Sequence, residues 1–167
     1  QIAMPECGIG LLPDVGGTLM RALAPGRLGE YLGTTAARMN GADAIFAGFA
    51  DHYIPQEQWP GLICTLEQTG DVDTIAAEAA SPAPGPLQAS MPDIDRHFHG
   101  AALGDVLTTL RAEDSDFARD TLKRMGRNSP LSMACTIEAL HRLRGPTQTL
   151  EKALDLEYRI PARAMEH

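Results

Sequence analysis

Two acidic residues near the start of the chain, Glu6 and Asp14, have types and spacing that suit acid–base chemistry. They lie eight positions apart in AMPECGIGLLPDVGG, residues 3–17, a segment otherwise rich in glycine and apolar residues. Glycine lets a loop turn sharply, so the chain between the acids can fold back and place both carboxyl groups in one pocket. An apolar pocket raises a carboxyl pKa, and a neighbouring carboxylate raises it further. One acid can then hold a proton while the other serves as base or nucleophile.

The same two residues also have a purely structural interpretation. Asp14 can cap a helix that begins near Gly16, because aspartate is a favoured N-cap residue. Glu6 can be an ordinary loop residue in contact with water. Two acids at this spacing are a weak motif, and both interpretations stay open on spacing alone.

The cysteine and histidine residues do not form a recognisable metal-binding pattern. Cys7, Cys64 and Cys135 are widely spaced and include no CxxC pair, so we interpret them as reduced thiols rather than zinc ligands. His97 and His99 flank a phenylalanine without acids in a suitable pattern, and we expect both at the surface. The sequence therefore predicts no metal site.

Length and charge narrow the class of protein. The chain has 167 residues, 44% of them hydrophobic, which is enough for one domain with a real core. The 22 acids against 14 bases give a net charge of −8, which argues against nucleic acid or an anionic membrane surface as a partner. The sequence contains no apolar run of about 18 residues, the length expected of a membrane span. Because the chain starts at Gln1 and a helical pattern runs into His167, we expect a segment of a longer protein.

The pattern along the chain predicts mixed structure followed by helices. The apolar run 2–4, closed by Pro5, predicts the end of a buried strand, and residues 52–54 predict a short strand. Four prolines in residues 81–92 predict an extended, exposed connector. We therefore divide the chain into a mixed part, 1–80, this connector, and a helical part, 93–167. Periodicity and capping residues predict helices over residues 18–23, 27–32, 41–47, 56–69, 93–98, 101–111, 115–125, 130–143 and 150–164.

The segment AMPECGIGLLPDVGG resembles the active-site segment of the crotonase (enoyl-CoA hydratase/isomerase) superfamily, and within it the 3-hydroxyisobutyryl-CoA hydrolase branch. Further similar segments follow in order: GRLGEYLGTTAARMNGADAIFAGFADHYIP, IDRHF, SPLSM and LEYR. The resemblance thus covers nearly the whole chain. It implies an α/β fold class, namely the C-terminal portion of a crotonase-like β-β-α spiral with a mostly helical second half.

The resemblance also implies roles for the two acids. Glu6 matches the catalytic glutamate, as nucleophile or general base, and Asp14 matches a second acid that assists proton transfer or holds a substrate hydroxyl. The implied reaction is hydrolysis of 3-hydroxyisobutyryl-CoA to 3-hydroxyisobutyrate and CoA in valine breakdown, with the oxyanion held by two backbone N–H groups. In the superfamily those groups, and much of the CoA site, lie upstream of the matched segment. We therefore expect residues 1–167 alone to be inactive.

The implied partners follow from the same resemblance. The expected ligand is an acyl-CoA substrate, and coenzyme A enters only as part of it, so no separate cofactor is expected. Superfamily members often form trimers or hexamers, which allows a homo-oligomer here. The expected location is the cytoplasm, or the mitochondrial matrix in a eukaryote.

Two groups of alternatives stay open. Within the superfamily, enoyl-CoA hydratases share the residue at Glu6, and dienoyl-CoA isomerases share acids with the spacing of Glu6 and Asp14. Outside enzyme function, the chain can be a non-catalytic remnant that binds CoA or a protein partner.

Overall fold

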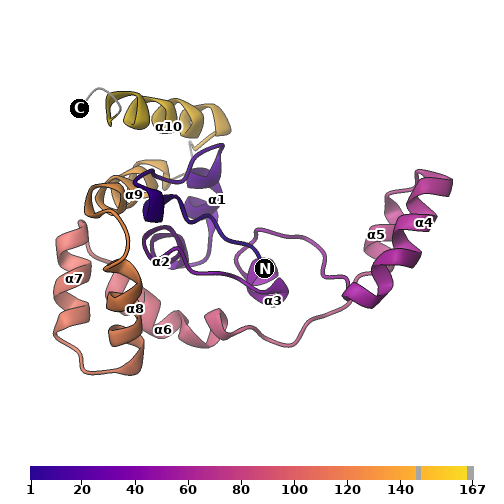
Figure 1. The fold of residues 1–167 in the computed structure, drawn as a ribbon, viewed down its shortest axis with the longest axis horizontal. Helices are drawn as coiled ribbons and strands as arrows, with labels where there is room; N and C mark the ends of the chain where they lie inside the picture. The colour runs from indigo at the N-terminus through magenta and orange to yellow at the C-terminus, as the bar shows by residue number, and fades with distance from the viewer. Residues whose placement is uncertain (146–147, 165–167) are drawn as a thin grey trace.

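The computed structural model describes residues 1–145 and 148–164, and this part of the chain is largely helical (Figure 1). Two short 3₁₀-helices occur in it, η1 (Glu6–Ile9) and η2 (Gln56–Gln58). The α-helices follow in this order: α1 (Gly17–Leu23), α2 (Leu28–Thr35), α3 (Gly41–Phe46), α4 (Trp59–Thr69), α5 (Asp73–Ala77), α6 (Pro86–Phe98), α7 (Leu103–Arg111), α8 (Asp116–Met125), α9 (Pro130–Leu143) and α10 (Leu150–Ala164).

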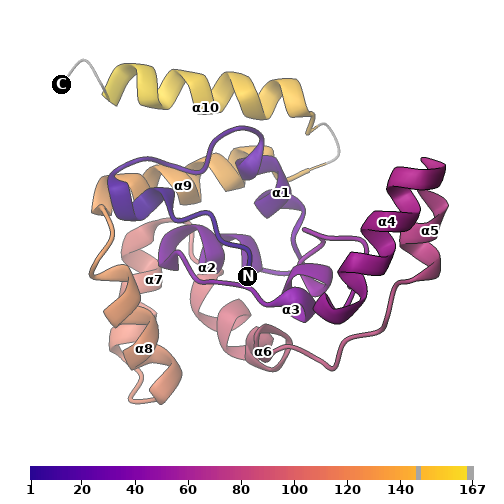
Figure 2. The same cartoon turned by 45° about the vertical axis from the view of Figure 1, so that its right-hand side comes forward.

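The centre of the molecule is formed by α1, α2 and α9, which pack against one another (Figures 1 and 2). Leu28, Leu32 and Ile137 are almost completely buried in this core. Gly29 allows α1 and α2 to approach closely, because a Cβ atom here would lie 2.1 Å from the carbonyl oxygen of Arg21. This packing fixes α1 firmly, and the loop that precedes α1 carries the candidate acids.

Helix α10 lies against α9 and α1 at the edge of the core (Figure 2). Ala153 of α10 is fully buried in a small apolar cluster with Leu140 and Leu143 of α9 and Ala22 of α1. Removing such a surface from water is favourable by roughly 25 cal/mol per Å². The last helix is therefore held beside the start of α1, although the two are far apart in the sequence.

Local sequence signals predict the starts of two helices correctly. The Asn40 side chain accepts a hydrogen bond from the backbone of Asp43 at 2.8 Å, and the Asp43 carboxylate accepts from the Asn40 N–H, which makes a capping box at α3. The Ser129 hydroxyl accepts from the N–H of Ser132 at 3.3 Å, with Pro130 in the first turn of α9. The predicted helices over 41–47 and 130–143 are confirmed.

The predicted strands are not confirmed. Residues 52–54 have no strand conformation, so that prediction was wrong. Near the N-terminus, Ile2 forms a single antiparallel bridge with Met39, with N–H···O distances of 2.9 and 2.8 Å. A strand is stabilised by a row of such pairs along a neighbour. Within the described residues, no neighbouring segment continues the pairing beyond this bridge.

The proline-rich segment is helical in part. Helix α6 begins at Pro86, inside the predicted connector 81–92, and continues through Pro92 to Phe98. The prediction of an extended segment was therefore wrong for residues 86–92. Proline is tolerated in a first turn, and burial of Leu87 and Ile94 favours the helix over its unfavourable residues. The division into parts 1–80 and 93–167 stays a prediction.

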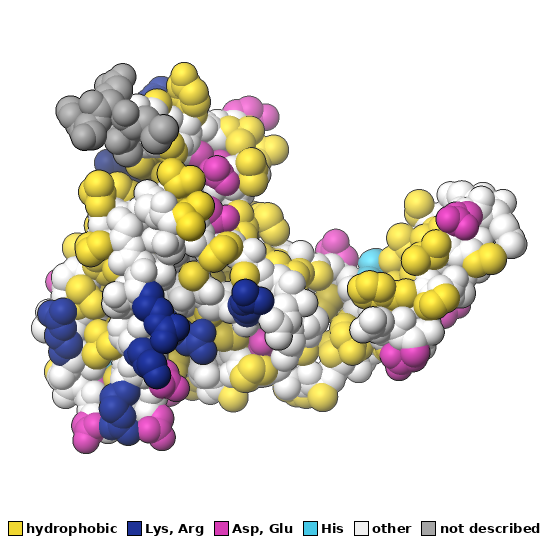
Figure 3. Space-filling model, viewed as in Figure 1, with side chains coloured by type: hydrophobic (Ala, Val, Ile, Leu, Met, Phe, Trp, Pro, Cys, Tyr) yellow, Lys and Arg dark blue, Asp and Glu magenta, His cyan; other side chains and the backbone are white. Residues whose placement is uncertain are grey.

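Helices α4 and α5 form an arm that projects from the rest of the molecule (Figure 1). Helix α5 was not predicted from the sequence. Apolar side chains are visible along the arm (Figure 3), and Trp59, Ile63 and Val72 are all more than half exposed. Over the residues described, no helix combines the length and apolar character needed to cross a membrane.

Candidate active site

Glu6 begins the 3₁₀-turn η1, directly after Pro5. Its side chain is 17% exposed, and its Oε2 atom is buried. This oxygen accepts no hydrogen bond from any described residue. The nearest cationic group recorded for it is the Nη2 atom of Arg21, 3.9 Å away. Glu6 is therefore not the solvated loop acid of the structural interpretation.

Arg21 reaches Glu6 from α1 and is itself buried. Its Nη2 atom donates to the carbonyl oxygen of Met4 at 3.0 Å, and its Nη1 atom donates to the carbonyl oxygen of Gly17 at 3.3 Å. Burial lowers the pKa of the guanidinium, and the negative charge of Glu6 opposes this shift. Arginine nevertheless stays charged in proteins. The structure thus places a positive charge beside the candidate carboxylate, which no sequence pattern indicated.

Asp14 lies at the first position of a tight turn before α1. Its carbonyl oxygen accepts from the N–H of Gly17 at 2.7 Å, and the two residues between have positive φ, 49° at Val15 and 87° at Gly16. The side chain is partly buried and borders a hollow of about 370 Å³, which residues of α10 also line. The N-cap residue of α1 is Gly16, which has no side chain, and the Asp14 carboxylate does not accept a hydrogen bond from the first turn of α1. The alternative in which Asp14 caps this helix is therefore not what the structure shows.

The donors at the start of α1 are instead satisfied by Glu157 of α10. Its Oε2 atom accepts from the N–H of Gly16 at 2.8 Å, and its Oε1 atom accepts from the N–H of Thr18 at 2.9 Å and from the Thr18 hydroxyl. Glu157 is only 4% exposed. Glu157 belongs to the LEYR segment, but its role could not be read from the sequence, because its partners Gly16 and Thr18 lie 141 and 139 positions away.

The two acids are linked through the first turn of α1 but do not line the same hollow. Glu6 faces Arg21, Arg21 bonds to the carbonyl of Gly17, and the N–H of Gly17 bonds to the carbonyl of Asp14. The hollow beside Asp14 does not include Glu6 in its lining. The pairing of the two carboxyl groups therefore stays a prediction, while their common support by α1 is a feature of the structure.

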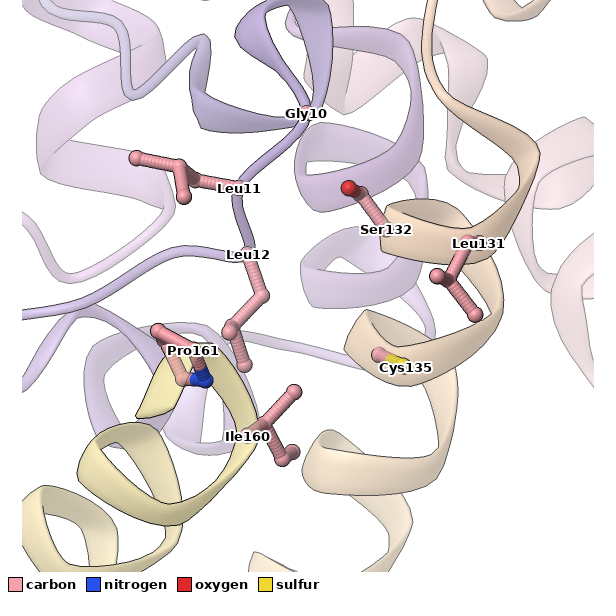
Figure 4. A pocket seen from close by; sticks show the side chains of 8 residues that line it. All are labelled: Gly10, Leu11, Leu12, Leu131, Ser132, Cys135, Ile160 and Pro161. Carbon is pink, nitrogen blue, oxygen red and sulfur yellow. The ribbon is translucent and has the colours of Figure 1, made fainter. Parts of the chain in front are cut away.

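A small apolar cavity of about 40 Å³ lies where the loop of residues 10–12, which connects the two acids, meets α9 and α10 (Figure 4). Burial raises the pKa of the Cys135 thiol at its edge. Burial likewise raises the pKa of Cys7, whose Sγ lies 3.3 Å from the hydroxyl of Thr136. Protonated thiols are poor nucleophiles. The cavity lining comprises Gly10, Leu11, Leu12, Leu131, Ser132, Cys135, Ile160 and Pro161.

The histidine prediction was half wrong. His97 is 2% exposed, stacks on Phe117, and has its Nε2 atom 3.3 Å from a carboxylate oxygen of Glu113. His99 is exposed, as expected. His97 is buried because it shares the core-facing side of α6 with Ile94. Groups of three or more acidic, histidine or cysteine side chains that could hold a metal do not occur in the part of the chain that the structure describes.

A family model described as "Enoyl-CoA hydratase/isomerase" matches residues 1–167. Among curated proteins, the mitochondrial 3-hydroxyisobutyryl-CoA hydrolase of Xenopus tropicalis is 33% identical over 175 residues, covering 98% of this chain and 45% of the relative. The human mitochondrial protein of the same name is 29% identical, with the same coverage. The chain therefore spans less than half the length of these relatives.

Solved structures agree with this similarity. An enoyl-CoA hydratase from Rhodobacter sphaeroides 2.4.1 is 49% identical, with a TM-score of 0.88 over 98% of this chain and 47% of its own. A carnitinyl-CoA dehydratase from Mycobacterium thermoresistibile is 36% identical, with a TM-score of 0.91 over 99% of this chain and 48% of its own. The fold class predicted from the sequence is thereby confirmed.

Proposed function

Because this chain belongs to the enoyl-CoA hydratase/isomerase family, we propose that the protein that carries it acts on an acyl-CoA thioester. The proposed reaction is hydrolysis of 3-hydroxyisobutyryl-CoA to 3-hydroxyisobutyrate and CoA, a step of valine breakdown. The names of the curated relatives at about one-third identity support this choice. The observation that carries it is the Glu6 carboxylate, which is largely buried and has an oxygen without a hydrogen-bond donor among the described residues.

That carboxylate has the properties that thioester hydrolysis requires. An oxygen that accepts no hydrogen bond keeps its lone pairs for attack on the thioester carbonyl, or for removal of a proton from an attacking water. Arg21 supplies a compensating charge at 3.9 Å without forming a direct hydrogen bond to Glu6. The net reaction consumes one water, breaks the carbon–sulfur bond and releases the acid and the thiol. Charge on the carbonyl oxygen requires backbone N–H donors, which the family resemblance assigns to residues outside this chain.

The proposed role of Asp14 is to carry a proton toward the departing thiolate or to hold the 3-hydroxyl group of the substrate. Its side chain stands on a backbone turn closed by a 2.7 Å hydrogen bond and borders a hollow between that turn and α10. A side chain on a rigid turn loses little entropy when it meets a substrate. The closed turn and the adjoining hollow favour a catalytic role for Asp14 over a role as a solvated surface acid.

Hydration of an enoyl-CoA is the second candidate. It is favoured by the 49% identity to a structure named as an enoyl-CoA hydratase, which is higher than the 33% and 29% identity to the two hydrolases named above. Both reactions start from a carboxylate in the position of Glu6, but hydration leaves the thioester intact. A dienoyl-CoA isomerase and a non-catalytic CoA-binding role are weaker candidates, since neither is named among the individual relatives and solved structures given above.

The experiment that separates these candidates uses the full-length protein. CoA release from 3-hydroxyisobutyryl-CoA is followed by thiol titration, and hydration of crotonyl-CoA is followed by loss of its enoyl absorbance. Hydrolase function requires rapid thiol release from the first substrate. Rapid loss of absorbance without thiol release would instead support hydratase function. Residues 1–167 expressed alone should be inactive with both substrates.

The remaining proposals concern the cofactor, the partners, the oligomeric state and the cellular location. We propose no cofactor apart from the CoA of the substrate and no nucleic-acid or membrane partner, and a homo-oligomer is to be tested by light scattering. The curated relatives named above are mitochondrial. For this protein we propose the mitochondrial matrix if its source is a eukaryote and the cytoplasm otherwise.

A further inference from the structure

We propose that Glu157 is a positioning residue that holds the turn carrying Asp14 in a strained conformation needed for turnover. The inference rests on the proposed function for its activity readout. It starts from the geometry of the turn and from the contacts of α10, both of which are independent of any substrate.

The turn has the geometry of type I′. The Asp14 carbonyl accepts from the N–H of Gly17, φ is 49° at Val15, and Gly16 has φ 87° and ψ 0°. Both central positions of a type I′ turn require positive φ, and asparagine followed by glycine is favoured there because these residues adopt positive φ readily. Valine is β-branched, and positive φ is unfavourable for such a residue. Residues held in this way persist only where their surroundings determine the conformation, and they gather at functional sites.

The valine side chain does not supply those determining contacts. Val15 is 82% exposed, so packing of its side chain contributes little to the conformation of the turn. The hydrogen bond between Asp14 and Gly17 closes the turn but does not select the handedness of its central residues. Another part of the protein must therefore stabilise this arrangement.

Glu157 provides three hydrogen bonds at the point where the turn enters α1. One oxygen accepts from the N–H of Gly16 inside the turn, and the other accepts from the N–H and the hydroxyl of Thr18. Hydrogen bonds to a carboxylate are about twice as strong as neutral ones. The two carboxylate oxygens thus bind the backbone N–H groups of Gly16 and Thr18, and these contacts fix the direction of the chain at Gly16.

Glu157 can act in this way because its helix is anchored away from the turn, against α9 and the later part of α1. One turn before it, Ala153 is fully buried, and Leu156 packs on the same cluster with Leu140 of α9. The position of the carboxylate is therefore set by the core, and not by the turn it contacts. The hollow beside Asp14 is bordered by Glu157 as well, so the turn and the helix form two sides of one feature.

Loss of this contact should misplace Asp14 without removing it. The turn can then relax toward conformations in which valine has negative φ, and the Asp14 carboxyl group moves with the backbone. A displacement of about 1 Å can reduce a rate by up to a hundredfold. Binding of the CoA moiety does not depend on this turn in the proposed function. We therefore expect kcat to fall in either role of Asp14, and KM to rise as well only if Asp14 holds the 3-hydroxyl group of the substrate.

The test compares Glu157→Gln in three backgrounds of the full-length enzyme: wild type, Val15→Asn and Val15→Ala. Glutamine has the size of glutamate but lacks its charge and one acceptor oxygen. In the wild-type background we expect kcat for CoA release to fall about tenfold, the scale of one strained residue. In the Val15→Asn background the loss should be less than about threefold, because an asparagine–glycine pair favours the type I′ turn by itself. Val15→Ala is the matched control, and there the tenfold loss should persist.

Several results would overturn the proposal. One is an equal loss of kcat in all three backgrounds; another is a loss confined to KM. A lower unfolding temperature with unchanged kcat per folded molecule would show that Glu157 only stabilises the fold. If Glu157→Gln does not fold, Thr18→Val removes one of the three donors and must give a smaller loss of kcat that Val15→Asn again reduces.

A second readout separates this inference from the proposed reaction. If the wild-type protein releases no CoA, the proposed function fails, and amide hydrogen exchange then decides the role of Glu157. The N–H groups of Gly16 and Thr18 should exchange at least about tenfold faster in Glu157→Gln than in wild type. Unchanged exchange at both positions would refute the positioning role whatever the substrate.

Discussion

Arg21 places its Nη2 atom 3.9 Å from the Oε2 atom of Glu6, and both side chains are largely shielded from water. The guanidinium also donates hydrogen bonds to the carbonyl oxygens of Met4 and Gly17. Arg21 therefore joins the segment before η1, the candidate carboxylate and the first turn of α1. An arginine in this position both compensates the charge of Glu6 and fixes the backbone around it.

The first prediction concerns this pair. Arg21→Met keeps an unbranched apolar stem but leaves the buried oxygen of Glu6 without its counter-charge. Removing one member of a buried ion pair costs about 3–5 kcal/mol, and the longer separation here places the expected loss near the lower value. Urea denaturation of the full-length protein measures it. Arg119→Met is the matched control: this arginine is exposed and should cost less than about 1 kcal/mol. Equal losses in the two variants would contradict the structural role of Arg21.

The second prediction concerns Glu6 as the catalytic carboxylate. Glu6→Gln keeps the shape of the side chain but cannot act as nucleophile or base. We expect kcat for CoA release to fall at least about a hundredfold, the scale of a lost acid–base group. Steady-state thiol titration measures this, with circular dichroism as a check of folding. Glu57→Gln, on the exposed η2, should keep wild-type turnover. Wild-type turnover in Glu6→Gln would end the assignment.

The third prediction concerns Asp14. Asp14→Asn retains the backbone turn, since its carbonyl makes the closing hydrogen bond, but removes the ionisable group. In the proposed hydrolase, CoA release should fall at least about tenfold, as expected for a lost proton-transfer group. Exposed Asp51→Asn is the control and should be unaffected. If Asp14→Asn hydrolyses its substrate as fast as wild type, Asp14 has no chemical role.

The fourth prediction follows from the pKa values of the thiols. Burial disfavours the thiolate and so raises the pKa of Cys7 and Cys135, which lowers their thiolate fraction at any given pH. Cys64 is exposed. Alkylation at pH 8, followed by peptide mass spectrometry, should therefore modify Cys64 first and Cys7 last. Alkylation in urea should remove the difference, because it comes from the fold. Faster modification of Cys7 than of Cys64 in the folded protein would contradict this.

Sequence alone was sufficient where the determining contacts are local. The cap at Asn40 reaches three residues along the chain, and so does the cap at Ser129. In α7, Val106 and Leu110 lie four positions apart and are both buried, which is the spacing of one face of the helix that periodicity predicted over 101–111. The family was also recognisable, because its motif is a continuous segment around Glu6.

Tertiary structure decided what depends on residues distant in the sequence. The turn of Val15 and Gly16 receives a carboxylate that lies 141 positions from Gly16 along the chain. The extended conformation predicted for 86–92 was replaced by a helix, because Leu87 and Ile94 are buried in this way. His97 was expected at the surface, and Arg21 was not considered, yet packing buries both side chains. Short-range hydrogen bonds and periodicity are properties of a segment, and these the sequence determines by itself. Burial and the partners of a buried charge are properties of the packed molecule, and these only the tertiary structure could decide.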